Sequence, residues 1–218
     1  MPGTAAPSEW VRRFLPLLRP GGRVLDLACG SGRHLGLLTG AGFAVTGVDR
    51  DAAAVQAWQG RAEIIVADIE AGPWPLAARR FDGIVVTNYL WRPLLPRIAE
   101  ALADGGVLIY ETFAQGHEAF GRPSNPAFLL APGELLTAFA GLHVVAFEDG
   151  LEHRPSPAGP RMVQRLAAVR PPASPGDGGP AAGAAPGTRE GPREGATAKI
   201  RLFPLNEAPP AGPEDSRP

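Results

Sequence analysis

A short apolar strand pattern runs directly into two glycines near residue 30, and this feature constrains the fold more than any other. The segment is Val24-Leu25-Asp26-Leu27-Ala28-Cys29-Gly30-Ser31-Gly32, and a helical pattern follows it. Glycines in such a turn let the backbone approach a ligand closely, and the start of a helix offers unpaired N–H groups. Asp26 lies near the carboxyl end of the strand, where open α/β sheets bind ligands. The segment therefore predicts a ligand site in an α/β domain.

Strand and helix patterns alternate through the first 170 residues. Strands are expected at residues 23–28, 43–49, 62–67, 81–87, 107–112, 142–147 and 162–169, and helices at 8–19, 33–40, 51–58, 94–103 and 132–139. This alternation indicates a parallel sheet with helices on both faces. No helix pattern separates the last two strands, so we expect them to pair antiparallel. Pro16 should disturb the first helix, and Asp104-Gly105-Gly106 should end the fourth.

The composition changes after residue 170. Residues 171–218 hold 11 prolines, 8 glycines and 9 alanines among 48 residues, a composition that cannot bury a core. We therefore expect a folded domain at 1–170 and a largely disordered tail at 171–218. Residues 200–205 are apolar, either as a stray stretch of the linker or as a short strand or motif that docks on the domain.

Several classes of protein are disfavoured by charge and by cysteine content. The formal net charge of the chain is −1, which gives no electrostatic case for binding nucleic acid or an anionic membrane. A single cysteine excludes a disulfide framework and a cysteine-rich metal site, and we expect no metal. No long apolar run opens the chain, so we expect no signal peptide, no membrane span and a cytoplasmic location. The oligomeric state stays open.

A second acidic residue follows the glycine turn at an informative distance. Asp49 ends the next strand, 23 residues after Asp26, and an acidic residue there can accept hydrogen bonds from a ribose diol. A nicotinamide cofactor would favour a third glycine where Leu35 stands. Asp26 would also be unfavourable beside a pyrophosphate, whereas it suits a ligand with an amino group.

These motifs resemble those of the class I S-adenosylmethionine-dependent methyltransferases. Asp26 to Gly32 looks like their first motif, and Val45 to Asp49 like their acidic second strand. Three further segments are similar to the later strands of that family and complete a match over about residues 21–170; they are Val66-Ala67-Asp68-Ile69, residues 81–86 and residues 105–109. The resemblance implies a bacterial enzyme with a Rossmann-like, seven-stranded, mostly parallel sheet whose last strand is antiparallel.

The resemblance also implies a role for each matching residue around S-adenosylmethionine. Gly30 and Gly32 would shape the turn against its methionine part, with Asp26 in the same site and Ala28 where the family often has glycine. Asp49 would bind the ribose hydroxyls. Arg50, Asp68 and Ile69 would border the adenine. Asn88 would lie near the methyl group that is transferred.

The methyl acceptor is less constrained by the sequence. Residues 113–130 form a long loop after the fifth strand, and loops of this length tend to be functional. We expect this loop to cover a small-molecule acceptor, with His117 or Glu111 as a general base and Tyr89 in the opposite wall. A thiol or chalcogen anion would need no base. The end of the domain is loosely similar to the tellurite-resistance methyltransferases. A non-catalytic cofactor-binding module and a protein or RNA methyltransferase are the alternatives.

Two residues near the glycine turn are also of interest. Cys29 is expected to be a small packed residue and not a nucleophile. Arg33 and His34 begin the following helix, where they would either contact a ligand or simply face solvent.

Overall fold

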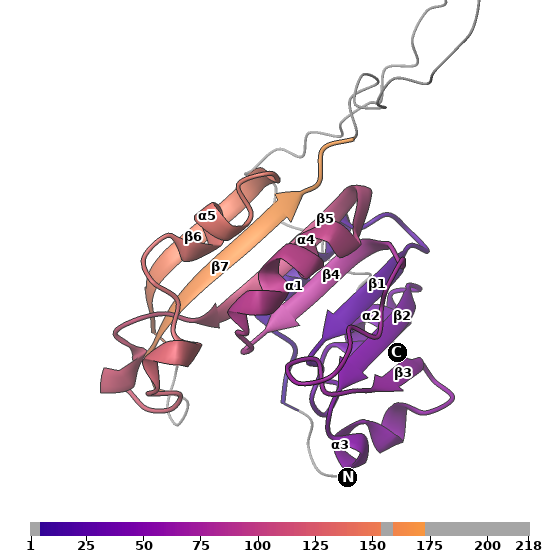
Figure 1. Cartoon of the computed structure of the whole chain (residues 1–218), viewed down its shortest axis with the longest axis horizontal. Helices are drawn as coiled ribbons and strands as arrows, with labels where there is room; N and C mark the ends of the chain where they lie inside the picture. The colour runs from indigo at the N-terminus through magenta and orange to yellow at the C-terminus, as the bar shows by residue number, and fades with distance from the viewer. Residues whose placement is uncertain (1–4, 154–158, 173–218) are drawn as a thin grey trace, which may run out of the picture. The chain divides into compact units, whose positions relative to one another are not determined.

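The computed structural model describes residues 5–153 and 159–172, which contain one seven-stranded sheet with helices packed on it (Figure 1). The strands are β1 (Arg23–Leu27), β2 (Ala44–Asp49), β3 (Glu63–Val66), β4 (Phe81–Thr87), β5 (Leu102–Phe113), β6 (His143–Glu152) and β7 (Arg161–Val169). Their order is β3-β2-β1-β4-β5-β7-β6. β1 to β5 pair in parallel, and β7 is antiparallel to both β5 and β6. The predicted mixed sheet with an antiparallel last strand is confirmed.

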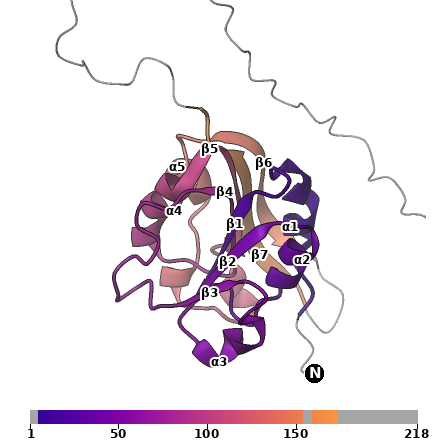
Figure 2. The same cartoon turned by 90° about the vertical axis from the view of Figure 1, so that its right-hand side faces the viewer.

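Helices lie on both faces of the sheet, and Figure 2 shows the two layers from the side. The α-helices are α1 (Glu9–Phe14), α2 (Leu35–Gly40), α3 (Ala52–Val55), α4 (Leu95–Ala101) and α5 (Glu134–Ala138). Short 3-10 turns are present at Leu15–Leu17, Gln56–Trp58, Arg92–Leu94, His117–Ala119 and Pro126–Phe128. α1 and α2 pack with Val24 and Val85 on one face, while α4 and α5 pack with Leu25 and Ile84 on the other. The central strand β4 is thus covered on both sides, which explains its unbroken apolar run.

The sequence predicted the end of α1 correctly but not the end of α4. α1 ends at Phe14 and continues as a 3-10 turn through Pro16, as the proline predicted. The prediction that residues 104–106 end the fourth helix is wrong, because α4 already ends at Ala101 and β5 begins at Leu102. Leu102 pairs with Phe81, and the register then shifts so that Val107 pairs with Gly83. Gly105 and Gly106 therefore lie at a register shift inside β5 and not at the end of a helix.

The strand order places the functional edge of the sheet. The chain moves outward from β1 to β2 and β3 and then returns to the other side of β1 to form β4. In open α/β sheets, ligands bind beyond the carboxyl ends of the strands at such a reversal. Residues 28, 49 and 88, which directly follow or end β1, β2 and β4, therefore belong to one edge.

All of the described residues belong to a compact unit that spans 1–177. Its last strand ends at Val169. The predicted tail at 171–218 lies outside the described residues beyond 172, and so does the apolar stretch at 200–205. Among the helices in the described ranges, none is long and apolar enough to cross a membrane.

Candidate functional site

A cavity of about 430 Å³ opens at the carboxyl ends of β1, β2 and β4. It is lined by seven residues that the sequence predicted for the site, namely Ala28, Asp49, Arg50, Asp68, Ile69, Asn88 and Tyr89, together with Ala67, Glu70 and Phe128. The cavity has the size of a small-molecule or cofactor site. Asp26, Gly30 and Gly32 do not line it, so Ala28 is the member of the first motif that stands on the cavity wall.

The two glycines of that turn are required for different reasons. Gly30 has φ +53°, and a Cβ there would meet nothing within 4 Å. Gly32 has φ +79°, and a Cβ there would lie 2.1 Å from Nε1 of Trp58. The Trp58 indole N–H donates to the Ser31 carbonyl oxygen at 3.0 Å. Gly32 therefore admits a buried tryptophan, whereas Gly30 is favoured by its left-handed backbone conformation.

Asp49 ties the turn after β1 to the end of β2. Its Oδ2 accepts a hydrogen bond from the Gly30 N–H at 2.7 Å, and its Oδ1 accepts one from the Asp51 N–H at 3.0 Å. Each carboxylate oxygen keeps a further lone pair. Asp49 can therefore hold the turn and still accept bonds from a ligand in the cavity.

Asp68 is fixed by its own turn after β3. One of its oxygens accepts the N–H groups of Glu70 and Ala71, at 2.9 and 3.0 Å. These two hydrogen bonds lower the pKa of the Asp68 carboxyl, so the group is ionised. Ile69 is buried beside it and supplies an apolar wall.

Asp26 is a buried acid next to the cavity. Its side chain is 1% exposed, and its Oδ2 has no hydrogen-bond partner within the described residues. Burial raises the pKa of Asp26 to about 7, although Arg33 acts in the opposite direction. A buried carboxylate oxygen without a partner is costly. The site therefore fits a ligand that brings a positive or hydrogen-bond-donating group to this corner.

Asn88 and Tyr89 form the wall that follows β4. Asn88 has φ +54°, and its N–H donates to the Glu111 carbonyl oxygen at 2.8 Å. The carbonyl oxygen of Tyr89 accepts the hydroxyl of buried Tyr110 at 2.9 Å. The Tyr89 hydroxyl itself is buried and has no hydrogen-bond partner among the described residues. Burial, with the nearby Glu70 charge, raises the pKa of Tyr89, so the phenol stays protonated.

A second cavity of about 280 Å³ adjoins the first. The two share Glu70, Asn88, Tyr89 and Phe128, and the second adds Leu90, Thr112, Phe113 and Pro123. These added residues come from the ends of β4 and β5 and from the long loop at 113–130. The predicted placement of that loop over a site is thus matched by Phe113, Pro123 and Phe128.

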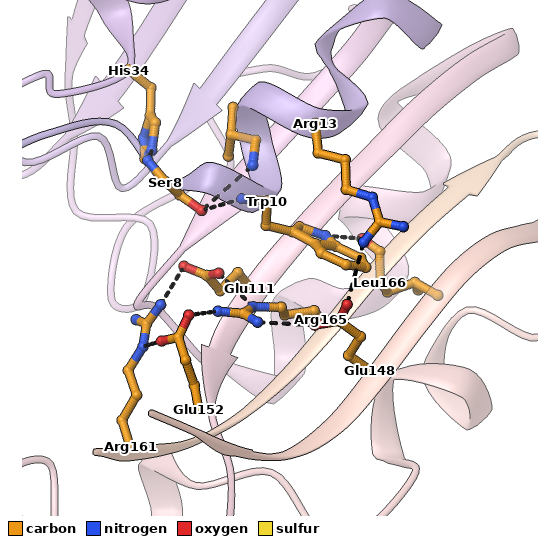
Figure 3. Close-up of polar contacts among 11 residues, drawn as sticks. Ser8, Trp10, Arg13, His34, Glu111, Glu148, Glu152, Arg161, Arg165 and Leu166 are labelled. Atoms are coloured by element: carbon orange, nitrogen blue, oxygen red, sulfur yellow. Dashed lines mark hydrogen bonds and ion pairs between the residues drawn. The ribbon is translucent and has the colours of Figure 1, made fainter. Parts of the chain in front are cut away.

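The two predicted base candidates lie outside both cavities. Glu111 is 1% exposed and is paired with Arg161 at 3.2 Å and with Arg165 at 2.7 Å (Figure 3). Its carboxylate is therefore already neutralised by two guanidinium groups. His117 is buried against the Phe113 ring, and its Nε2 lies 3.1 Å from the Arg122 carbonyl oxygen. Neither residue reaches a cavity where it could act as a base, whereas Tyr89 lines both cavities.

Arg92 fixes the end of the long loop at 113–130, a role that the sequence did not indicate. Its guanidinium donates to the carbonyl oxygens of Ala127 and Leu129, at 2.7 and 2.9 Å, and pairs with Glu134 at 2.7 Å. Phe128 lies between those two carbonyls and lines both cavities. Arg92 thus holds Phe128 at the boundary between the cavities.

His34 joins the first helix to the glycine turn instead of facing solvent. The ring is 1% exposed, and its Nε2 accepts the Ser8 N–H at 3.1 Å (Figure 3). Burial lowers the pKa of His34 to about 3, which keeps the ring neutral and able to accept. Ser8 also caps α1. Of the two alternatives left open for His34, solvent exposure is therefore wrong, while Cys29 is buried as a packed residue, as expected.

The family of this chain follows from its sequence. A family described as "Methyltransferase domain" matches residues 3–124, which is more than half of the chain. The chain belongs to this methyltransferase family. This membership identifies the protein as an enzyme that uses S-adenosylmethionine as the methyl donor. This agrees with the unpartnered Asp26 oxygen, because that cofactor carries an ammonium and a sulfonium. No curated protein matches the sequence significantly.

Solved methyltransferase structures share the fold at low sequence identity. TehB from Haemophilus influenzae is 18% identical with a TM-score of 0.62, over 77% of this chain and 63% of TehB. The chain thus spans less than two thirds of TehB. A TehB-like methyltransferase from Corynebacterium glutamicum is 22% identical with a TM-score of 0.55, over 74% of this chain and 86% of its own. Coclaurine N-methyltransferase, bound to N-methylheliamine and S-adenosylhomocysteine, is 15% identical with a TM-score of 0.55, over 74% of this chain and 70% of its own.

No group of three metal-binding side chains is brought together within residues 5–153 and 159–172. The expectation that the enzyme uses no metal stays a prediction.

Proposed function

We propose that this methyltransferase transfers a methyl group from S-adenosylmethionine to a small molecule. The observation that supports this most is the pair of adjoining cavities, which share Asn88 and Tyr89 at the end of β4. The larger cavity carries the cofactor motifs, and the smaller one is bounded by the long loop. An acceptor in the smaller cavity would therefore lie directly beside the donor.

In the larger cavity, the chain holds the cofactor through its strand ends. The Asp49 carboxylate would accept hydrogen bonds from the ribose hydroxyls, and Asp68 would accept one from the adenine amino group. Ile69 would pack on the adenine ring, with Arg50 at its border. Asp26 would face the ammonium of the amino acid part, whose positive charge would favour the ionised carboxylate. Ala28, Gly30 and Gly32 form the turn that admits it. The bound cofactor supplies a methyl group on a positively charged sulfur.

The chain accelerates transfer mainly by alignment and by excluding water. Asn88 and Tyr89 stand at the junction of the two cavities, so they orient the acceptor toward the donor. Phe113 and Phe128 line the acceptor side with apolar surface, which would exclude water from the reacting atoms once an acceptor is bound. No part of this requires Glu111 or His117.

The size of the acceptor cavity supports a small molecule over a macromolecule. A volume of about 280 Å³ lies just below the usual range for ligand sites, which begins at about 300 Å³. The net charge of −1 also offers no attraction for RNA or DNA. A cytoplasmic location, a bacterial origin, the absence of a nucleic-acid or membrane partner and the disordered tail after residue 170 are part of the same proposal.

The test uses the full chain with methyl-labelled S-adenosylmethionine and a cell extract that is then separated into metabolites, protein and nucleic acid. We expect label in the metabolite fraction, and its loss with Asp49→Ala. Label confined to protein or RNA would refute the small-molecule acceptor. Tight binding of S-adenosylhomocysteine with no label in any fraction would indicate a non-catalytic cofactor-binding module instead.

A further inference from the structure

The second cavity has an uneven distribution of charge. Glu70 is the one charged residue among the described residues that line it, and no arginine, lysine or histidine joins it there. Asn88 and Thr112 are polar but neutral, and the remaining lining is apolar or aromatic. A cavity with this lining favours a ligand that carries one positive or hydrogen-bond-donating group on an apolar body, and it disfavours an anion.

The hydroxyl of Tyr89 marks where the polar end of that ligand would lie. It is buried next to the carboxylate of Glu70 and makes no hydrogen bond of good geometry to any of the described residues. A buried hydroxyl without a partner costs free energy. A ligand N–H would supply the missing partner, while an anionic oxygen or sulfur would be repelled by Glu70.

Three aromatic rings complete the cavity, those of Tyr89, Phe113 and Phe128. Aromatic faces attract ammonium groups, and most strongly when water is excluded. Methylation of an amine yields an ammonium, so the same rings would stabilise positive charge as it develops on the acceptor.

We propose that the second cavity binds a small amine with an apolar or aromatic body, and that Glu70 and Tyr89 recognise its nitrogen. This rests on the proposed methyl transfer. The acceptor nitrogen loses one proton to water before transfer, and Glu70 and Tyr89 hold the neutral amine by its polar end. The nitrogen lone pair then forms the N–C bond while the C–S bond breaks and its electron pair returns to sulfur. The product is a methylated ammonium beside the Glu70 carboxylate.

The first experiment compares matched acceptors with purified full-length enzyme. Benzylamine, phenol, thiophenol and benzoate are each supplied with S-adenosylmethionine, after calorimetry has established that S-adenosylhomocysteine binds. We expect benzylamine to be methylated at least tenfold faster than the other three. Binding of S-adenosylhomocysteine with a preference for phenol, thiophenol or benzoate would overturn the amine assignment and leave methyl transfer intact. Absence of S-adenosylhomocysteine binding would overturn both.

The second experiment measures binding without turnover. Benzylamine, which is protonated at pH 7, should bind to the complex with S-adenosylhomocysteine at least tenfold more tightly than benzyl alcohol does. Glu70→Gln should remove most of that preference. Glu100→Gln, which changes an exposed glutamate on α4, should retain it. Equal binding of the two probes to the unaltered enzyme, or an unchanged preference in Glu70→Gln, would overturn the proposal.

Discussion

The cofactor side of the site is held by hydrogen bonds that span at most 19 residues of the chain, whereas the acceptor side is held in part by ion pairs that span 42 residues or more. Asp49 binds the N–H of Gly30, 19 residues away, and Asp68 binds the N–H groups two and three residues after itself. On the other side, Arg92 reaches Glu134 across 42 residues, and Arg165 reaches Glu111 across 54.

Because of this difference, substitutions should have different effects on the two sides of the site. The turns that receive the cofactor are specified locally, so they depend little on the rest of the domain. The acceptor side depends on β5, β6 and β7 being assembled first, since its ion pairs join those strands (Figure 3). We expect substitutions on the acceptor side to affect stability and substrate use more than cofactor binding.

The largest effect expected from breaking an ion pair is at Arg165. Its side chain is 12% exposed and pairs with Glu111, Glu148 and Glu152. Arg165→Met leaves buried Glu111 with only its longer bond to Arg161, so we expect a loss of about 3 kcal/mol in the free energy of unfolding. Urea denaturation measures it. Arg12→Met, which breaks an exposed pair with Glu9, should cost under about 1 kcal/mol. Equal losses for both would contradict the comparison.

A comparable effect, dependent on pH, is expected on the cofactor side at Asp26. Burial raises the pKa of Asp26 to about 7 from an ordinary value of 3.8. The folded chain thus binds this proton more tightly than the unfolded chain, and the stability that it contributes below pH 4 is lost as the pH rises through 7. Relative to the wild type, Asp26→Asn should gain up to about 4 kcal/mol between pH 4 and pH 8. A difference that does not change with pH would contradict the assigned burial effect.

Arg92 tests the acceptor side without a large change in the core. In Arg92→Met, the segment with Phe128 loses its bonds to the guanidinium, and we expect KM for the acceptor to rise about tenfold, equivalent to about 1.4 kcal/mol. Steady-state kinetics measures this change. Arg97→Met, at an exposed arginine of α4, serves as the control. An unchanged KM in Arg92→Met would show that the loop is held by other contacts.

The smallest effect is expected at Ala28, where the backbone has φ +54°. Glycine tolerates this conformation better than alanine does, although it also adds freedom to the unfolded chain. We expect Ala28→Gly to raise the free energy of unfolding by up to about 1 kcal/mol. Ala78 has φ +61° and does not line either cavity, so Ala78→Gly should show a similar gain. A loss in stability only in Ala28→Gly would mean that its methyl group is needed for packing.

The same contrast explains how far the sequence could predict the site. The fold and most of the cofactor cavity followed from local patterns, because strand ends, glycine turns and acidic residues lie within a few residues of one another. Glu70 was missed although it directly follows Ile69, since nothing in the sequence shows which way its side chain points. Glu111 was chosen as a base because it stands near a strand end, yet its two arginine partners come from β7.

The long loop shows the same limit. Its length predicted a role over the site, but Phe128 reaches both cavities because Arg92 and Glu134 fix the segment from outside the loop. Contacts of that kind depend on tertiary structure alone. His34 is similar, since its burial results from the distant Ser8 at the start of α1.

The most direct test of the account is calorimetric titration of the full chain with S-adenosylhomocysteine, compared with Asp49→Ala and with Asp51→Ala. Asp51 caps α3 and does not line either cavity. The account predicts binding of one equivalent to the wild type, an affinity lower by at least tenfold in Asp49→Ala, and an affinity close to that of the wild type in Asp51→Ala. No binding to the wild type, or equal affinity in all three proteins, would contradict the placement of the cofactor in the larger cavity.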